Sequence, residues 1–563
     1  MVMKEHKKKS LKQFGIVILV LLAVNIAGSY FFKRFDLTQD KRYTLSETSL
    51  EIIKKIDSPL YIDVFLDGQF PGEFKRLQGE TRQLLEEFKA YNSNIIFQFV
   101  NPLEKEEERE ATMKMMYQRG MNPISITVDD KGKQSQEVVF PWAIATYNDK
   151  VTKVQLLKNM MGATTEEKVV SSVQHLEYAF ADAFNKVIKG KEKKIAIIKD
   201  NGELHELQIA DFLKTVRENY YIGPFYMDSV AKNPVKTALA LKKYDLAIIA
   251  KPTKRFTEEE KQVLDQFIVN GGKTLWLVDA VQAEMDSLYN ENGAILAYPR
   301  DLNLNDMFFK YGVRINPALV KDEQAIPIKL ASGDKGSATQ YDQYFWKYSP
   351  FIYPQSQNPI VKNIEGVRFE FANPIDTLKN GIKKTVLMRS SQYSKTVGTP
   401  VEVSLNMVTE ETNPKDYAGK GYIPVSVLLE GKFNSMYENR VLPFKDTTYK
   451  TSGKNSKMIV ISDGDLIKNQ LDQAFQPLEL GYDKWTNNLY GNKEFLLNCV
   501  NYLLDDNGLI NIRSKDVDLP LLDKQKVYDN YTTTQIITVG LPIVVLLVFG
   551  ILFTFLRKRK YSR

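Results

Sequence analysis

The sequence predicts an α/β protein that is anchored in a membrane by two terminal helices. Two uncharged apolar runs, residues 14–32 and 536–556, hold 19 and 21 residues. Between them, short apolar segments typical of buried strands alternate with amphipathic segments of helical period. Only one cysteine, Cys499, occurs among 563 residues. No disulfide can therefore form within the chain, and the large central region must be stabilised by buried cores.

The charge of the chain is concentrated at its two ends. The formal net charge is +7, but residues 1–13 carry +4 and residues 557–563 carry +5, which leaves −2 for the region between them. Each apolar run is long enough to cross about 30 Å of hydrocarbon as a helix, and each basic end lies on the outer flank of its run. The positive-inside bias therefore predicts two cytoplasmic basic tails, with the bulk of the chain on the far side of the membrane.

Two alternatives were weighed against this topology. The first apolar run has the basic start of a cleaved signal peptide, but it is long, and Asn25-Ile26-Ala27 is a poor cleavage site. We therefore expect residues 14–32 to be retained as an anchor. The basic charge also raises the question of nucleic-acid binding. Because the central region is near neutral, it lacks the gathered Lys and Arg side chains that phosphates require, and no nucleic-acid partner is predicted.

Residues 33–190 are predicted to form a first extracytoplasmic domain. Its alternating elements are a strand at residues 60–66, a helix at 73–91, a strand at 95–100, a helix at 105–119, a hairpin at 124–128 and 138–147, and a long helix at 165–188. This βαβα-hairpin order is that of a thioredoxin-like fold. Since the catalytic thiols are absent, the redox activity of that fold is excluded.

Residues 191–279 and 457–515 are predicted to form a second α/β domain. Its strands and helices alternate at residues 195–198, 203–219, 245–250, 257–269 and 274–278. Such alternation predicts a mostly parallel, doubly wound sheet. Residues 280–456 are richer in Pro, Asn, Ser and aromatic side chains and are predicted as a β-rich insertion. Residues 516–535 are then a linker to the second membrane helix.

No cofactor is predicted. Gly272-Lys273-Thr274 mimics the end of a phosphate-binding loop, and residues 275–279 mimic an apolar strand that ends in a metal-binding aspartate, Asp279. A phosphate loop would require glycine at position 267, which is Phe267, and it would follow a strand and open a helix, whereas here the order is reversed. With three histidines and one cysteine, the chain also offers no histidine-rich or cysteine metal site. His175, in the long helix, is best explained as a partly buried structural residue.

The candidate site is Asp463-Gly464-Asp465, which follows the apolar strand predicted at residues 457–462. Carboxylates at the carboxyl end of a parallel strand lie where such sheets bind ligands, so a metal or sugar site is conceivable. The alternative is a structural turn in which Gly464 takes a positive φ and the two aspartates cap the following helix. The turn is favoured, because the sequence shows no second cluster of ligands.

Short motifs are spread from residue 36 to residue 513. They are Asp36-Leu37-Thr38, Lys41-Arg42-Tyr43-Thr44-Leu45-Ser46, Leu429-Glu430-Gly431-Lys432-Phe433 with Asn439-Arg440, Asp463-Gly464-Asp465, Phe495-Leu496-Leu497-Asn498, Tyr502-Leu503-Leu504-Asp505-Asp506 and Gly508-Leu509-Ile510. Their order, together with the two terminal apolar runs, resembles the GldG family of Bacteroidetes, the auxiliary proteins of gliding-motility-type ABC transporters.

The resemblance implies a substrate-binding-like component that works with an ATPase and a membrane permease in gliding motility and the associated protein secretion. It also implies a bacterial inner membrane, with the bulk of the chain in the periplasm. For the second domain it implies an amidotransferase-like fold, since the family's central region resembles a domain that is shared with intraflagellar-transport proteins and is related in fold to glutamine amidotransferases. The amidotransferase cysteine and histidine have no counterparts here, which supports binding instead of catalysis.

We therefore predict a non-enzymatic, membrane-anchored periplasmic auxiliary component of an ABC transporter. Its expected partners are the permease and ATPase subunits, and its substrate, a small molecule or a protein, stays open. Two alternatives also stay open: an extracytoplasmic metal-dependent hydrolase that uses Asp463 and Asp465, and an envelope scaffold without a transporter.

Overall fold

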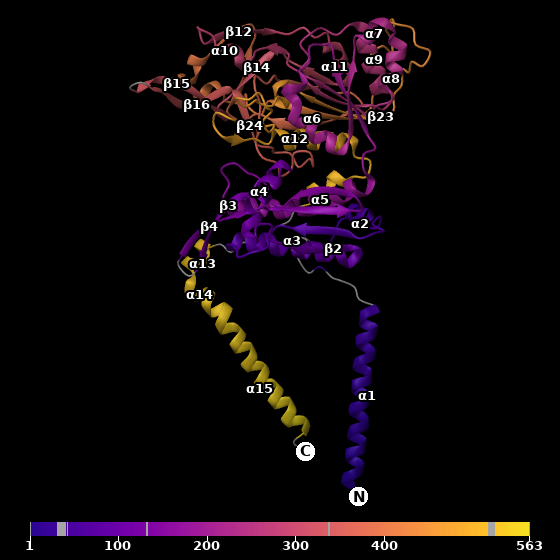
Figure 1. Cartoon of the computed structure of the whole chain (residues 1–563), viewed down its shortest axis with the longest axis vertical. Coiled ribbons are helices and arrows are strands. Elements are labelled where there is room, and N and C mark those ends of the chain that lie inside the picture. Colours follow the sequence, from indigo (N-terminus) through magenta and orange to yellow (C-terminus); the bar gives the residue numbers. More distant parts are fainter. Residues whose placement is uncertain are drawn as a thin grey trace. The chain divides into compact units, whose positions relative to one another are not determined.

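The computed structural model describes residues 2–30, 36, 41, 43–130, 133–335, 338–515 and 524–561. The chain is a mixed α/β protein with many sheets (Figure 1), and it divides into two compact units, Met1–Lys515 and Asp516–Arg563. Part of the motif that follows the first apolar run, namely Leu37, Thr38 and Arg42, lies outside the described residues, as do residues 516–523 of the predicted linker.

A four-stranded sheet with the order β2-β1-β5-β6 organises the first part of the chain. Strand β1 (Leu60–Val64) pairs in parallel with β2 (Ile95–Phe99) and antiparallel with β5 (Trp142–Tyr147), which pairs antiparallel with β6 (Lys150–Gln155). The helices of this part are α2 (Glu47–Ile53), α3 (Gly72–Tyr91), α4 (Arg109–Gln118) and α5 (Thr165–Lys189). Helix α5 begins at a capping box between Thr164 and Glu167, which satisfies backbone donors of its first turn.

The predicted hairpin of residues 124–128 and 138–147 is wrong in its second strand. Strand β3 (Ile124–Asp130) pairs with β4 (Lys133–Val139) as a separate two-stranded sheet, and the chain breaks at Phe140 and Pro141 before β5 begins. Proline has no N–H to donate to a ladder, so Pro141 cannot lie inside a continuous central strand. The hairpin that completes the four-stranded sheet is β5–β6, whose second strand the periodicity did not reveal.

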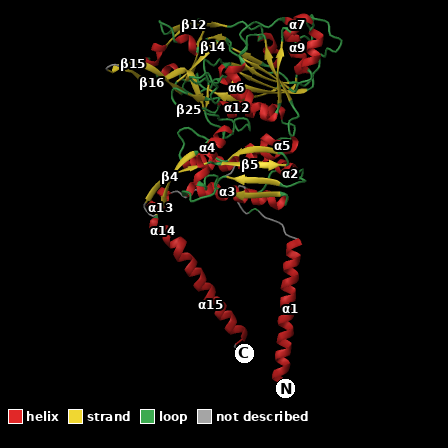
Figure 2. Ribbon diagram, in the orientation of Figure 1, coloured by secondary structure: helices red, strands yellow, loops and turns green. Residues whose placement is uncertain are grey.

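A seven-stranded sheet with the order β19-β22-β23-β10-β9-β7-β8 dominates the second part of the chain. Its parallel strands are β7 (Lys194–Lys199), β8 (Tyr221–Tyr226), β9 (Leu246–Ala250), β10 (Lys273–Leu277) and β23 (Asn455–Ile461). Alternate side chains of β7 enter opposite cores. One core contains residues of α6 (Ala210–Asn219) and α12 (Asn492–Leu504), and the other contains residues of α8 (Pro234–Leu241) and α9 (Glu258–Val269). Helices therefore cover both faces of this sheet (Figure 2), which explains why the central strands β9 and β10 are almost entirely buried.

The large sheet also takes two strands from residues 280–456, so the prediction that this whole region is an insertion is wrong for these strands. Strand β22 (Pro424–Lys432) pairs antiparallel with β23, and β19 (Lys383–Arg389) pairs antiparallel with β22. The rest of this region forms small sheets from β11 (Val281–Gln282), β12 (Ala294–Pro299) and β21 (Val401–Ser404), from β13 (Val313–Ile315) and β18 (Ile375–Thr377), from β14 (Ala318–Asp322) and β20 (Ser394–Gly398), and from β15 (Ala325–Lys335), β16 (Ala338–Ile352) and β17 (Val367–Arg368). The region is thus β-rich, but it is continuous with the sheet.

Apart from α1 and the 3-10 turns, the other helices and strands of the first unit are short. They are α7 (Ser229–Lys232), α10 (Met285–Leu288), α11 (Asn305–Tyr311), β24 (Tyr482–Asp483) and β25 (Asn488–Leu489). Cys499 on α12 is free and buried, as its inward position in the helical pattern predicts.

A buried ionic network joins the two parts of the first unit. Glu494 Oε1 on α12 lies 2.9 Å from Lys158 Nζ and 3.0 Å from Arg513 Nη2, and both cations are almost fully buried. Arg513 Nη1 also lies 3.2 Å from Nδ1 of His175 on α5. Burial, and then the neighbouring charges of Arg513 and Lys158, lower the pKa of His175 well below its usual value, so this histidine is a neutral structural residue.

The second unit contains the helix that meets the requirements of a membrane span. After α13 (Lys524–Asp529), it runs through α14 (Tyr531–Gln535), a π-helical turn (Ile536–Gly540) and α15 (Leu541–Tyr561). Among the described residues, Tyr531–Arg559 is the one helix long and apolar enough to cross a membrane. Helix α1 (Val2–Tyr30) contains a shorter apolar part, Lys12–Ile26. The predicted first span, residues 14–32, is therefore not confirmed, and its last residues, Phe31 and Phe32, lie outside the described residues.

Candidate functional site

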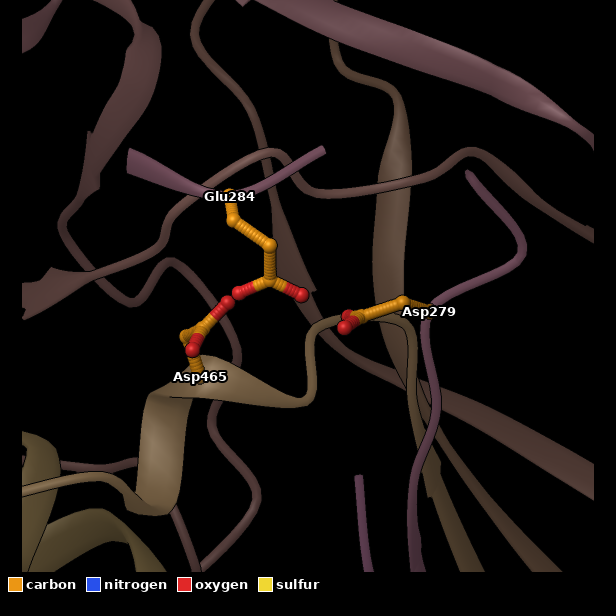
Figure 3. A group of neighbouring side chains, drawn as sticks. All are labelled: Asp279, Glu284 and Asp465. Atoms are coloured by element: carbon orange, nitrogen blue, oxygen red, sulfur yellow. The ribbon is translucent and has the colours of Figure 1, made fainter. Parts of the chain in front are cut away.

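Four charged side chains converge at the carboxyl end of the parallel strands. Lys251 directly follows β9, Asp279 follows β10 and Asp465 follows β23. Glu284 directly precedes the short helix α10, without a capping hydrogen bond from its side chain. The carboxyl ends of neighbouring parallel strands meet at one edge of a sheet, so residues as much as 214 positions apart in the chain become neighbours. Figure 3 shows the three carboxylates directed toward one another, with Asp465 on a short helical turn and Asp279 on a loop.

The ammonium group of Lys251 lies among these carboxylates. Its Nζ atom is 2.5 Å from Oδ2 of Asp465 and 2.6 Å from Oε2 of Glu284, and it is 3.7 Å from Oδ2 of Asp279. The Lys251 side chain is 3% exposed, and those of Asp279 and Asp465 are 6% exposed. Arg300, also buried, brings its Nη2 atom to 3.4 Å from Oε1 of Glu284. Lys468 adds a third cation, with its Nζ atom 4.0 Å from Oδ1 of Asp465. The cluster thus carries three acidic and three basic side chains, of which only Glu284 and Lys468 are substantially exposed, at 30% and 28%.

The mutual attraction of these charges decides the protonation of Lys251. Burial alone favours the neutral amine, but the fields of Asp465, Asp279 and Glu284 outweigh it and raise the pKa of Lys251 above its usual value. Burial raises the pKa of Asp279 to about 6, against the opposing attraction of Lys251. Lys251 is therefore a fixed cation, unsuited to act as a base or a nucleophile at neutral pH.

Asp463, one of the two predicted site residues, does not belong to this ion cluster. Its Oδ1 atom accepts a hydrogen bond of 2.8 Å from the backbone N–H of Asp465, and its Oδ2 atom accepts one of 2.6 Å from the N–H of Glu370. Burial, and then the nearby charges of Asp465 and Asp279, raise the pKa of Asp463 well above its usual range. Asp463 therefore bonds the backbone at the start of the short 3-10 turn of residues Asp465–Ile467, in which Gly464 holds the N-cap position.

The predicted positive φ of Gly464 is wrong. Gly464 has φ −78° and ψ −23°, a conformation open to any residue. The structure requires glycine there for another reason: a Cβ atom would lie 2.5 Å from Cγ of Lys251 and 2.9 Å from Oδ2 of Asp279. Gly464 thus leaves the space through which the Lys251 side chain reaches the carboxylates, and its N–H donates a 2.5 Å hydrogen bond to Oδ1 of Asp279.

Sequence reasoning missed most of this cluster. Asp465 was a candidate, and Asp279 was noted only as part of a false phosphate-loop pattern. Lys251, Glu284 and Arg300 were not considered. For Lys251 a signal was available, because it follows an apolar strand, as Asp279 and Asp465 do. Glu284 and Arg300 belong to an irregular region, where no periodicity marks the residues that turn back toward the sheet.

Comparison with known proteins identifies the family of this chain. The model of a family described as an ABC-type uncharacterized transport system matches residues 192–499, more than half of the chain. The chain belongs to this family. Residues 39–146 match a second model, a domain of unknown function (DUF7088). Membership indicates an auxiliary, transport-associated role together with an ABC transporter, and the family is not a known class of enzyme.

The chain is also similar to two individual proteins. An uncharacterized protein of Borreliella burgdorferi is 21% identical over 562 residues, which cover 97% of each chain. The solved structure of the mmIFT52 N-terminal domain is 13% identical, with a TM-score of 0.32 over 56% of this chain and 99% of that chain.

Proposed function

We propose that this protein is a non-enzymatic auxiliary component of an ABC transporter of the gliding-motility type, anchored in the inner membrane and holding its large central region in the periplasm. The family match to residues 192–499 carries the proposal. The apolar helix Tyr531–Arg559, which ends in basic residues, supports anchoring. Since basic flanks stay on the cytoplasmic side, this helix would enter the membrane from the periplasm.

The domain division is part of the same proposal. Residues 33–190 would form a thioredoxin-like domain, and residues 191–279 with 457–515 an amidotransferase-like domain, connected to the membrane by helices at residues 14–32 and 536–556. The apolar helices would pair with a multi-span permease, and a separate ATPase subunit would hydrolyse ATP. The central region would bind the substrate or a partner protein.

The chemistry of the sheet edge favours a binding role over hydrolysis. A metal-dependent hydrolase needs carboxylates that are free to hold the metal or activate water. Here Asp465 is engaged by Lys251, and both oxygens of Asp463 accept backbone hydrogen bonds. Both carboxylates are thus engaged in contacts within the protein, which supports the non-enzymatic interpretation.

Affinity purification of the tagged full chain from native membranes in mild detergent tests the proposal. We expect a multi-span permease and an ABC ATPase to copurify in constant ratio. A matched chain that ends at residue 515 lacks the second unit and should lose the permease. Recovery of neither subunit would contradict the transporter assignment and favour an envelope scaffold.

A further inference from the structure

We propose that Lys251 is the built-in cation of a three-carboxylate site, and that the same site becomes a divalent-metal site once the lysine side chain is removed. In the native chain, the ammonium group takes the place that a metal ion would take. The inference concerns the architecture of the sheet edge and does not depend on the transport role.

The three carboxylates form a donor set suited to a hard cation. One oxygen from each of Asp279, Glu284 and Asp465 lies within 4.8 Å of the others. Ca²⁺ binds oxygen ligands at about 2.3–2.6 Å, so two of its ligands can lie up to about 5 Å apart. Carboxylate oxygens are also the preferred ligands of Mg²⁺ and Mn²⁺. The spacing of these oxygens therefore fits a single metal ion.

The ammonium group satisfies this donor set only in part. Two of the oxygens lie within hydrogen-bond distance of Lys251 Nζ, whereas Oδ2 of Asp279 is 3.7 Å away. Oδ2 of Asp279 and Oδ1 of Asp465 are both buried without any hydrogen-bond partner among the described residues. These unpartnered oxygens belong to side chains that are more than nine-tenths buried. A metal ion could bind atoms that a lysine leaves unsatisfied.

The charge of the cluster favours a cation in place of the ammonium group. With Lys251 present, three carboxylates face three cations, Lys251, Arg300 and Lys468, whose Nζ atom lies 4.0 Å from Oδ1 of Asp465. Without the ammonium group, one negative charge in a largely buried site has no cation beside it. Uncompensated buried charge is strongly destabilising, so the altered site gains stability from any cation that fits.

The native backbone is built to hold the lysine. Lys251 has φ +56°, a left-handed conformation that is unfavourable for a residue with a side chain. Gly464 leaves room for the Cγ atom of Lys251, where any Cβ would clash. These two features direct the ammonium group between the ends of β10 and β23. As a result, the junction between the sheet and residues 280–456 forms without a metal ion.

Three full-length proteins in detergent test the proposal: wild type, Lys251→Ala and Lys251→Ala/Asp465→Asn. Each is freed of metal and titrated with Mn²⁺, Ca²⁺ and Mg²⁺ separately, with thermal unfolding and Mn²⁺ equilibrium dialysis as readouts. We expect Lys251→Ala to melt below wild type without metal and to recover with at least one ion. It should bind Mn²⁺ at least about tenfold more tightly than wild type, and the added Asp465→Asn change should abolish this gain.

Lys261→Ala is the matched control, because Lys261 is also a fully buried lysine but pairs with only two carboxylates, those of Glu258 and Asp306. This variant should gain no metal dependence. The proposal is overturned if wild type binds Mn²⁺ as tightly as Lys251→Ala, or if Lys251→Ala gains no stability from any of the three ions. Failure of Lys251→Ala to refold both with and without the metals counts equally against it, since the metal is expected to replace the ammonium group.

Discussion

Removal of the Glu494 carboxylate should weaken the junction between the two parts of the first unit. In the Glu494→Ala variant, Lys158 and Arg513 lose the anion that both contact, at 2.9 Å and 3.0 Å. Both cations are almost fully buried, so water cannot replace the lost partner. Breaking a buried ion pair costs about 3–5 kcal/mol. Because the Glu494 side chain is 28% exposed, we expect the lower end, about 3 kcal/mol.

The assay is equilibrium urea unfolding of the full chain in detergent, followed by far-UV circular dichroism. Glu494→Gln, which keeps the size but not the charge, should show most of the same loss. Glu108→Ala is the control, because the pair of Glu108 with Lys105 lies on the surface at 3.4 Å, and its loss should change the free energy of unfolding by less than about 0.5 kcal/mol.

The loss of stability in Glu494→Ala should also depend on pH. Burial acts to raise the pKa of Glu494, but the attraction of Lys158 and Arg513 prevails and lowers it. A carboxylate with a lowered folded-state pKa contributes stability that is present above its usual pKa of 4.5 and is lost as the pH falls through the folded-state value. The difference between wild type and Glu494→Ala should therefore shrink in acid. A loss at pH 7 no larger than that of Glu108→Ala would refute the reasoning.

Three further predictions concern single residues. Burial raises the pKa of Glu203 to about 7 from 4.5, so the contribution of this carboxyl group to stability is lost as the pH rises through 7. Relative to wild type, the free energy of unfolding of Glu203→Gln in urea should therefore be higher at pH 8 than at pH 5, by up to about 3 kcal/mol. A difference between the two proteins that is the same at both pH values would contradict this. Burial raises the pKa of the Cys499 thiol, so a maleimide should label it only after unfolding, and rapid native labelling would show the core to be open. Gly464→Ala should lower the free energy of unfolding by about 1–3 kcal/mol, because the added Cβ atom would clash with Lys251. As a control, Gly79→Ala, in open space within α3, should raise the free energy of unfolding by about 0.5–1 kcal/mol. Equal effects of the two substitutions in thermal melts would be inconsistent with the clash.

Local and periodic features were predictable from the sequence. Four of the five parallel strands of the large sheet, β7, β9, β10 and β23, are short and largely apolar, so their positions follow from hydrophobic periodicity. The fifth, the edge strand β8, has mostly exposed or half-buried side chains and was not predicted. The start of α9 at Thr257 is visible because the capping residue and Glu260 are only three positions apart. The apolar helix Tyr531–Arg559 follows from its composition alone.

The tertiary structure alone decided which distant residues meet. Strands β19 and β22 join the large sheet because long connections bring them beside β23, and no short-range pattern encodes that pairing. Gly464 suggests a positive φ by its residue type, yet its role is set by the side chain of Lys251, more than two hundred residues earlier. Whether Asp465 holds a metal or a lysine likewise depends on what the fold places beside it. The sequence by itself determined most of the central parallel strands and the helix near the carboxyl end that is long and apolar enough to span a membrane. The packing of the sheet, which joins strand ends far apart in the chain, decided the ion cluster and with it the chemistry of the site.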